Sequence, residues 1–384
     1  MNRNTQHWDI FCTVVDNYGD IGVTWRLARQ LAHEYALDIR LWVDDLQSFA
    51  HILPMLDPQQ PQQCFDGVTI LHWQTPLPRE WQPGDVLIEA FACELPPQVL
   101  RLLPTLPSPP VWINLEYLSA EAWVDDCHGL ASPALDGVKK VFYFPGFSAQ
   151  SGGLICEQAL FEQRDAWQHS SQGKKSLWQS LGLDIAENDI VISLFCYQHA
   201  PMDGLLALWR DGPQTHHLLV PAGKAFDAIT PWLQQQSFTR ENDGLHVAGH
   251  LHVHRLPMTN QQGYDQLLWS CDFNIVRGED SFLRAQWAAK PFIWHIYPQE
   301  EDAHLLKLDA FMQRYCHNLS STVANDWQQL NLAFNQQDAE AVCHYWQKLI
   351  PVKGALLQHA KQWPIDAIND ADLANRLVKM VKNG

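Results

Sequence analysis

The sequence alternates short apolar runs with amphipathic runs, and this alternation constrains the fold more than any other feature. In the first half, the runs that predict strands are Ile10–Val15, Asp38–Val43, Val68–His72, Val86–Glu89, Val111–Leu115 and Lys140–Phe144. The runs between them that predict helices include Ile21–Tyr35, Leu46–Leu53 and Pro97–Leu103. Strands that alternate with helices form a parallel sheet with helices on both faces. We therefore expect an α/β domain in this half.

A second series of the same kind follows residues 163–188, where polar and charged side chains dominate. Its expected strands are Asp189–Phe195, His216–Val220, Leu245–Val247, Leu251–Leu256, Phe273–Val276 and Phe292–Ile296. Its expected helices are Pro201–Trp209, Gln261–Ser270 and Ser281–Ala289, and a helical segment begins near Asp302. A length of 384 residues also favours two domains. We expect domains at 1–170 and 185–364, with a C-terminal helix within 365–384 that packs back on the first.

Charge and composition narrow the classes of partner. The chain has 26 Lys and Arg against 43 Asp and Glu, a formal net charge of -17, which argues against nucleic acid and favours a cationic partner. No apolar run approaches ~18 residues and the N-terminus lacks a signal pattern, so we expect no membrane span and no export. Nine scattered cysteines without a C-x-x-C motif are typical of reduced thiols in the cytoplasm.

Residues 16–22 (DNYGDIG) lie where the first predicted strand gives way to the first predicted helix. Open α/β sheets bind their ligands at this edge, outside the carboxyl ends of the strands. Asp16 and Asp20 are therefore candidate ligand-facing carboxylates, and Gly19 and Gly22 allow close approach of the backbone. The alternative is that Asp20 caps the helix and Asp16 belongs to a turn. The stretch by itself favours that alternative.

The stretch Arg277–Phe282 (RGEDSF) occupies an equivalent position in the second series. A helix N-terminus offers free N–H groups and a positive dipole end, which suits a diphosphate. Gly278 permits close approach, Ser281 adds a hydroxyl donor, and Arg277 can offset phosphate charge. Glu279 can accept a hydrogen bond from a ribose diol. A segment that only caps the helix is an equally supported alternative.

Three aromatic residues accompany this stretch. Phe195 and Tyr197 close the first strand of the second domain, so we expect them at the same sheet edge as Arg277, and Tyr264 lies in a neighbouring predicted helix. A nucleobase stacks on a flat ring, and a tyrosine hydroxyl can reach a phosphate. Ordinary core aromatics are the alternative, and the residues alone favour it.

Three histidines alternate at His250, His252 and His254, so they share one face of a predicted strand. A metal site would need a fourth group and a second shell, and the sequence indicates neither. We interpret these histidines as a solvated strand face and predict no metal. No G-x-G-x-x-G motif follows the first strand, so a nicotinamide enzyme has little support.

Six segments in order along the chain carry a resemblance to a known family. They are DNYGDIGV (16–23), EAFACELP (89–96), LEYLSAE (115–121), GFSAQSGGL (146–154), IVRGEDSF (275–282) and FIWHIYPQ (292–299). On these segments the chain resembles the bacterial elongation factor P arginine rhamnosyltransferases (EarP), nearly from end to end.

The resemblance implies a GT-B-like α/β fold, with two Rossmann-like domains facing each other across a cleft. It implies an inverting transfer of rhamnose from dTDP-β-L-rhamnose to an arginine of folded elongation factor P in the cytoplasm, without a cofactor. It also implies that Asp20 is the catalytic carboxylate and Asp16 its partner. The donor-binding residues that it implies are Phe195, Tyr197, Gln261, Tyr264, Arg277, Gly278, Glu279, Asp280 and Ser281.

Two alternatives stay open at this point. A sugar-nucleotide epimerase of the same architecture would use the same donor site but no protein acceptor. A non-catalytic adaptor would clamp elongation factor P and transfer no sugar. The residues alone also leave open the identity of the sugar, and which of Asp16 and Asp20 takes the proton.

Overall fold

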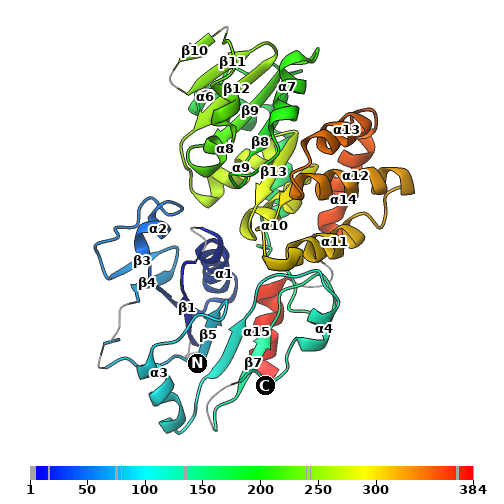
Figure 1. The fold of residues 1–384 in the computed structure, drawn as a ribbon. Coiled ribbons are helices and arrows are strands. Elements are labelled where there is room, and N and C mark those ends of the chain that lie inside the picture. Colours follow the sequence, from blue (N-terminus) through cyan, green and yellow to red (C-terminus); the bar gives the residue numbers. More distant parts are fainter. Residues whose placement is uncertain are drawn as a thin grey trace. The chain divides into compact units, whose positions relative to one another are not determined.

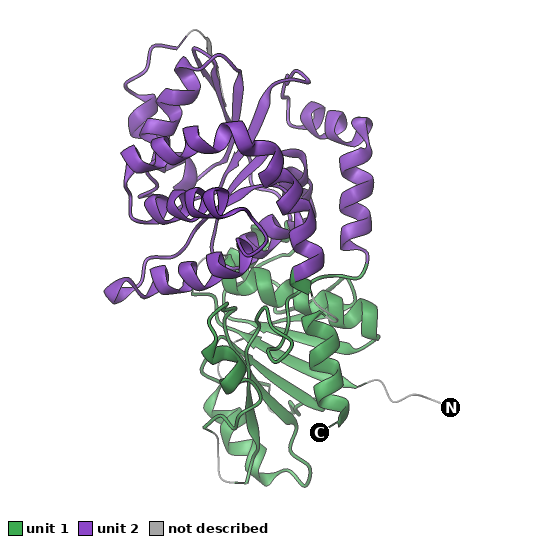
Figure 2. Ribbon diagram, turned by 90° about the vertical axis from the view of Figure 1, so that its right-hand side faces the viewer, with its two compact units in different colours: residues 1–158, 367–384 green, residues 159–366 purple. Residues whose placement is uncertain are grey.

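The structure is a computed structural model that describes residues 6–15, 18–73, 77–78, 80–133, 137–238, 240–242, 244–368 and 372–383. The chain forms two compact units (Figure 2). Unit 1 comprises residues 1–158 and 367–384, and unit 2 comprises residues 159–366. The chain therefore leaves unit 1 once and returns to it once.

Unit 1 is built on a sheet with the strand order β3-β4-β2-β1-β5-β6-β7 within the described residues (Figure 1). Neighbouring strands are parallel except for the β3–β4 pair at one edge. The strands are β1 (His7–Cys12), β2 (Asp38–Val43), β3 (Gln62–Phe65), β4 (Val68–His72), β5 (Val86–Ala90), β6 (Val111–Leu115) and β7 (Lys140–Tyr143). The helices are α1 (Gly19–Tyr35), α2 (Leu46–Ala50), α3 (Pro97–Leu102), η1 (Leu103–Thr105), α4 (Trp123–Cys127) and α15 (Leu373–Asn383).

The central strand β1 is buried from Trp8 to Cys12, as expected for a strand covered on both faces. Asp9 is a charged residue inside this strand. Its carboxylate accepts hydrogen bonds from Arg40 (2.6 Å), the Trp42 indole (2.8 Å) and the Gly84 amide (2.8 Å). Burial raises the pKa of Asp9, and the Arg40 charge opposes that rise. A buried carboxylate persists here because it is fully partnered.

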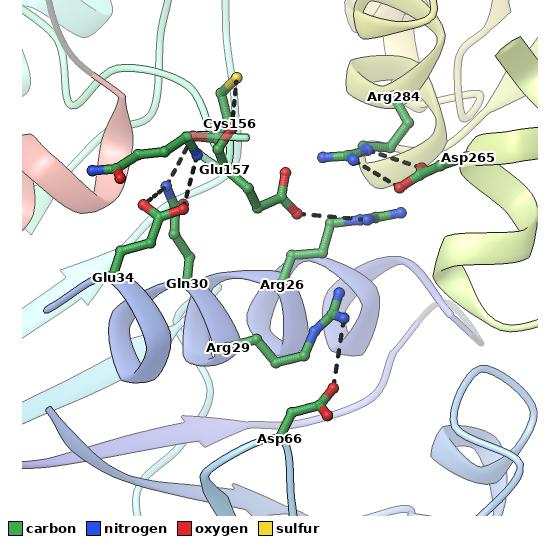
Figure 3. Close-up of polar contacts among 10 residues, drawn as sticks. Arg26, Arg29, Gln30, Glu34, Asp66, Cys156, Glu157, Asp265 and Arg284 are labelled. Carbon is green, nitrogen blue, oxygen red and sulfur yellow. Dashed lines mark hydrogen bonds and ion pairs between the residues drawn. The ribbon is translucent and has the colours of Figure 1, made fainter. Parts of the chain in front are cut away.

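Helix α1 ties distant segments of unit 1 together (Figure 3). The Gln30 amide donates to the Cys156 carbonyl at 2.8 Å and to the Asp372 carboxylate at 3.1 Å. Arg26, which is buried, lies 3.8 Å from Glu157. The helix therefore anchors both the last residues before the chain leaves unit 1 and the first residues after it returns.

Helix α15 completes unit 1 (Figure 1). The Leu373 amide donates to the Leu154 carbonyl at 2.8 Å, and the Tyr143 hydroxyl donates to the Leu373 carbonyl at 3.3 Å. Arg376 donates to the carbonyls of Ser148 and Ser151, both at 2.8 Å. The most C-terminal helix is thus held by backbone groups of a segment more than two hundred positions earlier in the sequence.

Unit 2 is built on a sheet with the strand order β10-β11-β12-β9-β8-β13-β14 within the described residues. The β10–β11 and β11–β12 pairs are antiparallel and the other pairs are parallel. The strands are β8 (Ile190–Leu194), β9 (His216–Pro221), β10 (Arg240–Asn242), β11 (Leu245–Ala248), β12 (Leu251–Leu256), β13 (Phe273–Arg277) and β14 (Phe292–His295). The helices are α5 (Leu160–His169), α6 (Ser171–Ser180), α7 (Asp203–Asp211), α8 (Lys224–Leu233), α9 (Gln261–Ser270), α10 (Asp280–Trp287), η2 (Glu300–Asp302), α11 (Ala303–Tyr315), α12 (Ser321–Asn335), α13 (Ala339–Leu349), η3 (Ile350–Val352) and α14 (Lys353–Ile368).

These two largely parallel sheets confirm the predicted pair of Rossmann-like domains. The polar stretch 163–188, where we expected the domain boundary, instead contains most of α5 and all of α6. Its polar side chains bond into unit 2: the Trp167 indole donates to Ser270 at 2.9 Å and Arg164 donates to the Trp287 carbonyl at 3.0 Å. Among helices within the described ranges, none has the length and hydrophobicity needed to cross a membrane.

Candidate functional site

The carboxyl ends of β8 and β13 bring the predicted aromatic and cationic residues of unit 2 together. Ile275 of β13 pairs with Leu194 of β8, and the Phe195 amide continues the ladder by donating to the Ile275 carbonyl at 2.8 Å. The Arg277 guanidinium then lies over two rings, 4.6 Å from the centroid of Phe195 and 4.8 Å from that of Tyr197. Cation–π attraction holds this side chain at the sheet edge.

One polar group in this cluster, the Nη1 group of Arg277, is buried without a hydrogen-bond partner among the described residues. The Tyr264 ring meets Phe195 edge to face at 5.9 Å, and burial raises the pKa of its hydroxyl, with the neighbouring Ser281 hydroxyl opposing that rise. Buried polar groups are nearly always hydrogen-bonded in native proteins, so unsatisfied ones indicate a ligand or water.

The loop between β13 and α10 presents the N-terminus of α10 to this cluster. Gly278 has φ +65°, a left-handed conformation that a side chain would strain. Glu279 precedes the helix without capping it through its side chain, and Ser281 is buried in the first turn. The Trp294 indole fixes the loop by donating to the Gly278 carbonyl at 3.0 Å. Backbone N–H groups at such a terminus suit an anionic ligand.

A buried ion pair fixes α10 relative to α9. Arg284 of α10 donates to the Asp265 carboxylate through two nitrogens, at 2.9 and 2.7 Å (Figure 3). Gln261, the first residue of α9, is also buried, and the Asn260 side chain caps that helix by accepting from the Gly263 amide at 2.8 Å. A bidentate pair has a defined geometry, so it sets the positions of Tyr264 and Ser281 on their helices. Local sequence pattern does not reveal this pair, because its members are nineteen positions apart.

His295 supports Tyr197 from behind, a role that the sequence did not reveal. Its Nδ1 accepts from the Tyr197 amide at 3.2 Å, and its ring meets that of Tyr197 edge to face at 5.2 Å. Burial, together with the nearby Arg277 charge, lowers the pKa of His295 to about 3. The imidazole is therefore neutral, so it adds no positive charge of its own beside the guanidinium.

In unit 1, Asp20 lies in the first turn of α1 and is 4% exposed. Its carboxylate accepts a hydrogen bond from the Val15 amide at 3.0 Å and one from the Tyr117 hydroxyl at 3.1 Å. The residue preceding the helix is Tyr18, which makes no side-chain cap. Asp20 is therefore not the N-cap residue of α1, and its carboxylate binds the loop before the helix and Tyr117.

Tyr117 is the residue at this edge that sequence reasoning missed. It stacks on Phe91 with ring centroids 4.5 Å apart and is 41% exposed. Phe91 and Tyr117 come together because β5 and β6 are parallel and end in register, with Ala90 opposite Leu115. Phe91 and Ala92 have φ of 57° and 52°, a strained conformation of the kind that collects at functional sites.

Asp16, the second predicted carboxylate, lies outside the described residues together with Asn17. Its partnership with Asp20 stays a prediction. The roles of the donor-binding residues also stay predictions, although the structure brings most of them together at the carboxyl ends of β8 and β13 and the adjoining turns of α9 and α10.

The histidine interpretation needs correction. His250 precedes β12 and is exposed, whereas His254 is buried, so the three residues are not one solvated face. His217 of β9 joins His252 and His254, and within the described residues these three form a group that could hold a metal ion. Burial lowers the pKa of His254 to about 3, and burial also lowers the pKa of His217. Register between strands, which the sequence does not display, creates this cluster.

Comparison with known proteins agrees with the six segments found in the sequence. A family model described as Elongation-Factor P (EF-P) rhamnosyltransferase EarP matches residues 8–382. A protein-arginine rhamnosyltransferase of Shewanella oneidensis is 57% identical over 390 residues, covering 99% of both chains.

Solved structures agree as well. One from work on EarP-mediated arginine glycosylation of translation elongation factor EF-P is 32% identical, with a TM-score of 0.68, and covers 99% of this chain and 100% of that chain. A glycosyltransferase of Rickettsia africae is 9% identical with a TM-score of 0.52, covers 99% of this chain and 98% of that chain, and supports the GT-B fold alone. The chain therefore belongs to the EarP family of elongation factor P rhamnosyltransferases.

Proposed function

We propose that this chain transfers rhamnose from dTDP-β-L-rhamnose to an arginine side chain of elongation factor P, with inversion at the sugar. The observation that carries the donor part is the buried Arg277, whose Nη1 lacks a partner among the described residues beside a helix N-terminus. A diphosphate supplies the anionic oxygens that such a group requires. An acceptor that is a translation factor would be met in the cytoplasm.

The donor would bind along the carboxyl edge of the unit 2 sheet. Phe195 and Tyr264 would flank the thymine. Gln261, the first residue of α9, lies on the same helix as Tyr264 and would be nearby. The hydroxyls of Tyr197 and Ser281 and the backbone amide of Asp280 would donate to the diphosphate. Asp280 would use its amide because its carboxylate would repel the phosphate charge. Arg277 would offset phosphate charge, and Glu279 would accept from the ribose.

The reaction forms one bond and breaks another. A guanidinium nitrogen of the acceptor attacks C1 of rhamnose, the bond from C1 to the diphosphate oxygen breaks, and dTDP departs with that electron pair. The guanidinium has a pKa above ~12 and a delocalised lone pair, so a base cannot remove its proton beforehand. We assign Asp20 as the group that takes the proton as the new bond forms, with Asp16 aligning the planar fork.

We also propose that the reaction needs no metal. Arg277, the Ser281 hydroxyl and the N-terminus of α10 would meet the charge that develops on the departing diphosphate. Turnover should therefore be unchanged in EDTA, measured as initial rate with purified enzyme. Activity that is lost in EDTA and restored by magnesium or manganese would contradict this part.

The deciding experiment is an intact-mass spectrum of elongation factor P after incubation with enzyme and donor. A gain of one deoxyhexose is expected, and fragmentation should locate it on arginine. The Asp20→Asn variant is the matched control, since it keeps the side-chain shape. An unmodified partner that still binds the enzyme would favour the adaptor.

An isomerised sugar, or free nucleotide formed from donor alone, would favour the epimerase. A short peptide containing the arginine should be a poor substrate if the folded acceptor is what docks. Equal rates for peptide and protein would overturn that expectation.

A further inference from the structure

A cluster of three imidazoles lies on one face of the unit 2 sheet. His252 of β12 is in register with His217 of β9, and His254 follows two positions later on the same face. Their ligand-type nitrogens all lie within 4.8 Å of one another. His217 meets His252 edge to face at 4.7 Å and stacks on His254 at 5.1 Å. Two of the rings are buried and His252 is half-buried, which leaves a route from solvent.

The hydrogen bonds of this cluster form the arrangement that metal-binding histidines use. His217 Nε2 lies 2.9 Å from the Asp189 carboxylate, and His217 Nδ1 lies 2.9 Å from His254 Nε2. A carboxylate accepts, so His217 carries its proton on Nε2 and presents a lone pair at Nδ1. The Ala186 amide fixes Asp189 by donating to the same oxygen at 3.0 Å. A carboxylate that orients a histidine in this way is the usual second shell of a metal site.

In the contact between His217 and His254, the proton on His254 Nε2 is donated to His217 Nδ1. Without that proton, both nitrogens could bind a cation. If His254 moves its proton to Nδ1, its Nε2 lone pair also points into the cluster. Zn–N bonds of about 2.0–2.1 Å place two ligand nitrogens about 3.3 Å apart in a tetrahedron. The 2.9 Å pair is close to that separation, and His252 would need to turn inward.

We propose that His217, His252 and His254 bind a divalent transition-metal ion, represented by Zn²⁺, with water as the fourth ligand and Asp189 as the second shell. Imidazole ligands without carboxylate favour zinc, copper or nickel over magnesium and calcium. His217 and His252 are each the second residue of their strand, near the amino ends of β9 and β12, whereas the donor candidates lie at the carboxyl ends of β8 and β13. The ion would therefore link two strands and stabilise unit 2 without entering the reaction.

The test uses the full-length chain without a histidine tag, stripped with a chelator and titrated with Zn²⁺ against a chromophoric chelator. Wild type should bind one ion through this site, and Zn²⁺ should raise its melting temperature. His252→Gln and His254→Gln should each bind at least tenfold more weakly, and Asp189→Asn about 10- to 100-fold more weakly. Magnesium should raise the melting temperature of none of them.

His250→Gln is the matched control, because His250 is exposed and two positions from the cluster. It should bind zinc and gain thermal stability as wild type does. Equal zinc affinity in wild type and His252→Gln would overturn the proposal, as would a zinc-induced rise in melting temperature that survives in Asp189→Asn unchanged. His252 is half-buried, so its variant tests the site even if His254→Gln fails to fold.

Discussion

Asp20 is the residue at which a catalytic role and a structural role predict different outcomes. Asp20→Asn keeps one oxygen that can accept from the Val15 amide, and its NH2 group can donate to the Tyr117 hydroxyl oxygen. The variant removes the charge and the basicity. If Asp20 takes the proton, kcat should fall by ~10²–10⁴ while donor binding and the melting temperature stay nearly unchanged. Single-turnover rates, donor calorimetry and thermal melts check this together.

A purely structural Asp20 predicts the reverse pattern for the same variant, with a lower melting temperature and an unchanged kcat. Tyr117→Phe is the companion variant. It removes one hydrogen bond to Asp20 but keeps the ring that stacks on Phe91. A normal turnover number in Asp20→Asn would mean that this carboxylate only stabilises the loop before α1.

Ser281 and Tyr197 test the placement of the donor. Ser281→Ala and Tyr197→Phe each remove one hydroxyl that would bind the diphosphate, at ~1–2 kcal/mol for a charge-assisted hydrogen bond. The donor KM should rise about 5- to 30-fold in each variant. Ser176→Ala, on the exposed face of α6, is the control with the same chemical change. Donor titrations that are identical in all three variants would move the donor elsewhere.

At the scale of the elements, two carboxylates lie where the start of α15 meets α1, Asp372 before α15 and Glu34 on α1, and both accept from Gln30. Burial disfavours the charged form of each. The Asp372 carboxylate accepts from the Asn375 amide at 3.0 Å and from Gln30 at 3.1 Å. Burial raises the pKa of Asp372. Burial also raises the pKa of Glu34, and the charge of Asp372 adds to that rise. The folded state therefore holds protons that the unfolded state has already lost.

The sign of the pH dependence follows from these directions. A carboxyl whose folded-state pKa is raised stabilises the fold below its unfolded pKa, and that contribution disappears as the pH rises through the folded value. Asp372→Asn removes this dependence but keeps an acceptor for the Asn375 amide. The melting temperature of Asp372→Asn minus that of wild type should grow from about pH 4 to about pH 8.

Melts across this range check that prediction, and the same series in a Glu34→Gln background is the control. The increase should be smaller there, since one of the two like charges is gone. A difference between variant and wild type that shrinks as the pH rises would contradict the coupling.

The sequence predicted elements well where the pattern was periodic and poorly where the partner was distant. The strand Leu251–Leu256 and the helix Gln261–Ser270 have the predicted bounds, because turn residues delimit them. The first strand begins at His7 rather than Ile10, because Asp9 is buried through partners on β2, and it ends at Cys12 rather than Val15. Helix α5 was missed because Arg164 and Trp167 bond to unit 2 instead of solvent. Helix α6 was missed because most of its residues are polar and exposed, so the sequence shows little apolar periodicity there.

The residues of the candidate site also differ in how far the sequence could predict them. Arg277 and Ser281 could be predicted because a strand, a short loop and a helix follow one another directly in the sequence. Tyr117, His295 and His217 could not, because each reaches its partner through strand register or a contact between separate elements. Local pattern carries no information on such pairings.

At the scale of the whole molecule, the formal net charge of -17 should assist encounter with a cationic acceptor. Long-range attraction acts on association and is screened within about 10 Å at 0.1 M salt. kcat/KM for elongation factor P should therefore fall as salt rises, while kcat at saturating acceptor stays constant. Initial rates across a salt series measure both quantities. A flat kcat/KM profile would remove the electrostatic part of the proposal.

The return of the chain to unit 1 has a consequence for biosynthesis. Unit 2 is one continuous segment, residues 159–366, whereas unit 1 lacks α15 until that helix has been translated. Domains fold as they emerge from the ribosome, so the second unit in the sequence can reach its native state before the first is complete. Until then, the backbone carbonyls of Ser148 and Ser151 lack the hydrogen bonds that Arg376 of α15 donates to them. Nascent chains stalled just before Leu373 should therefore be cleaved by protease in unit 1 while unit 2 resists.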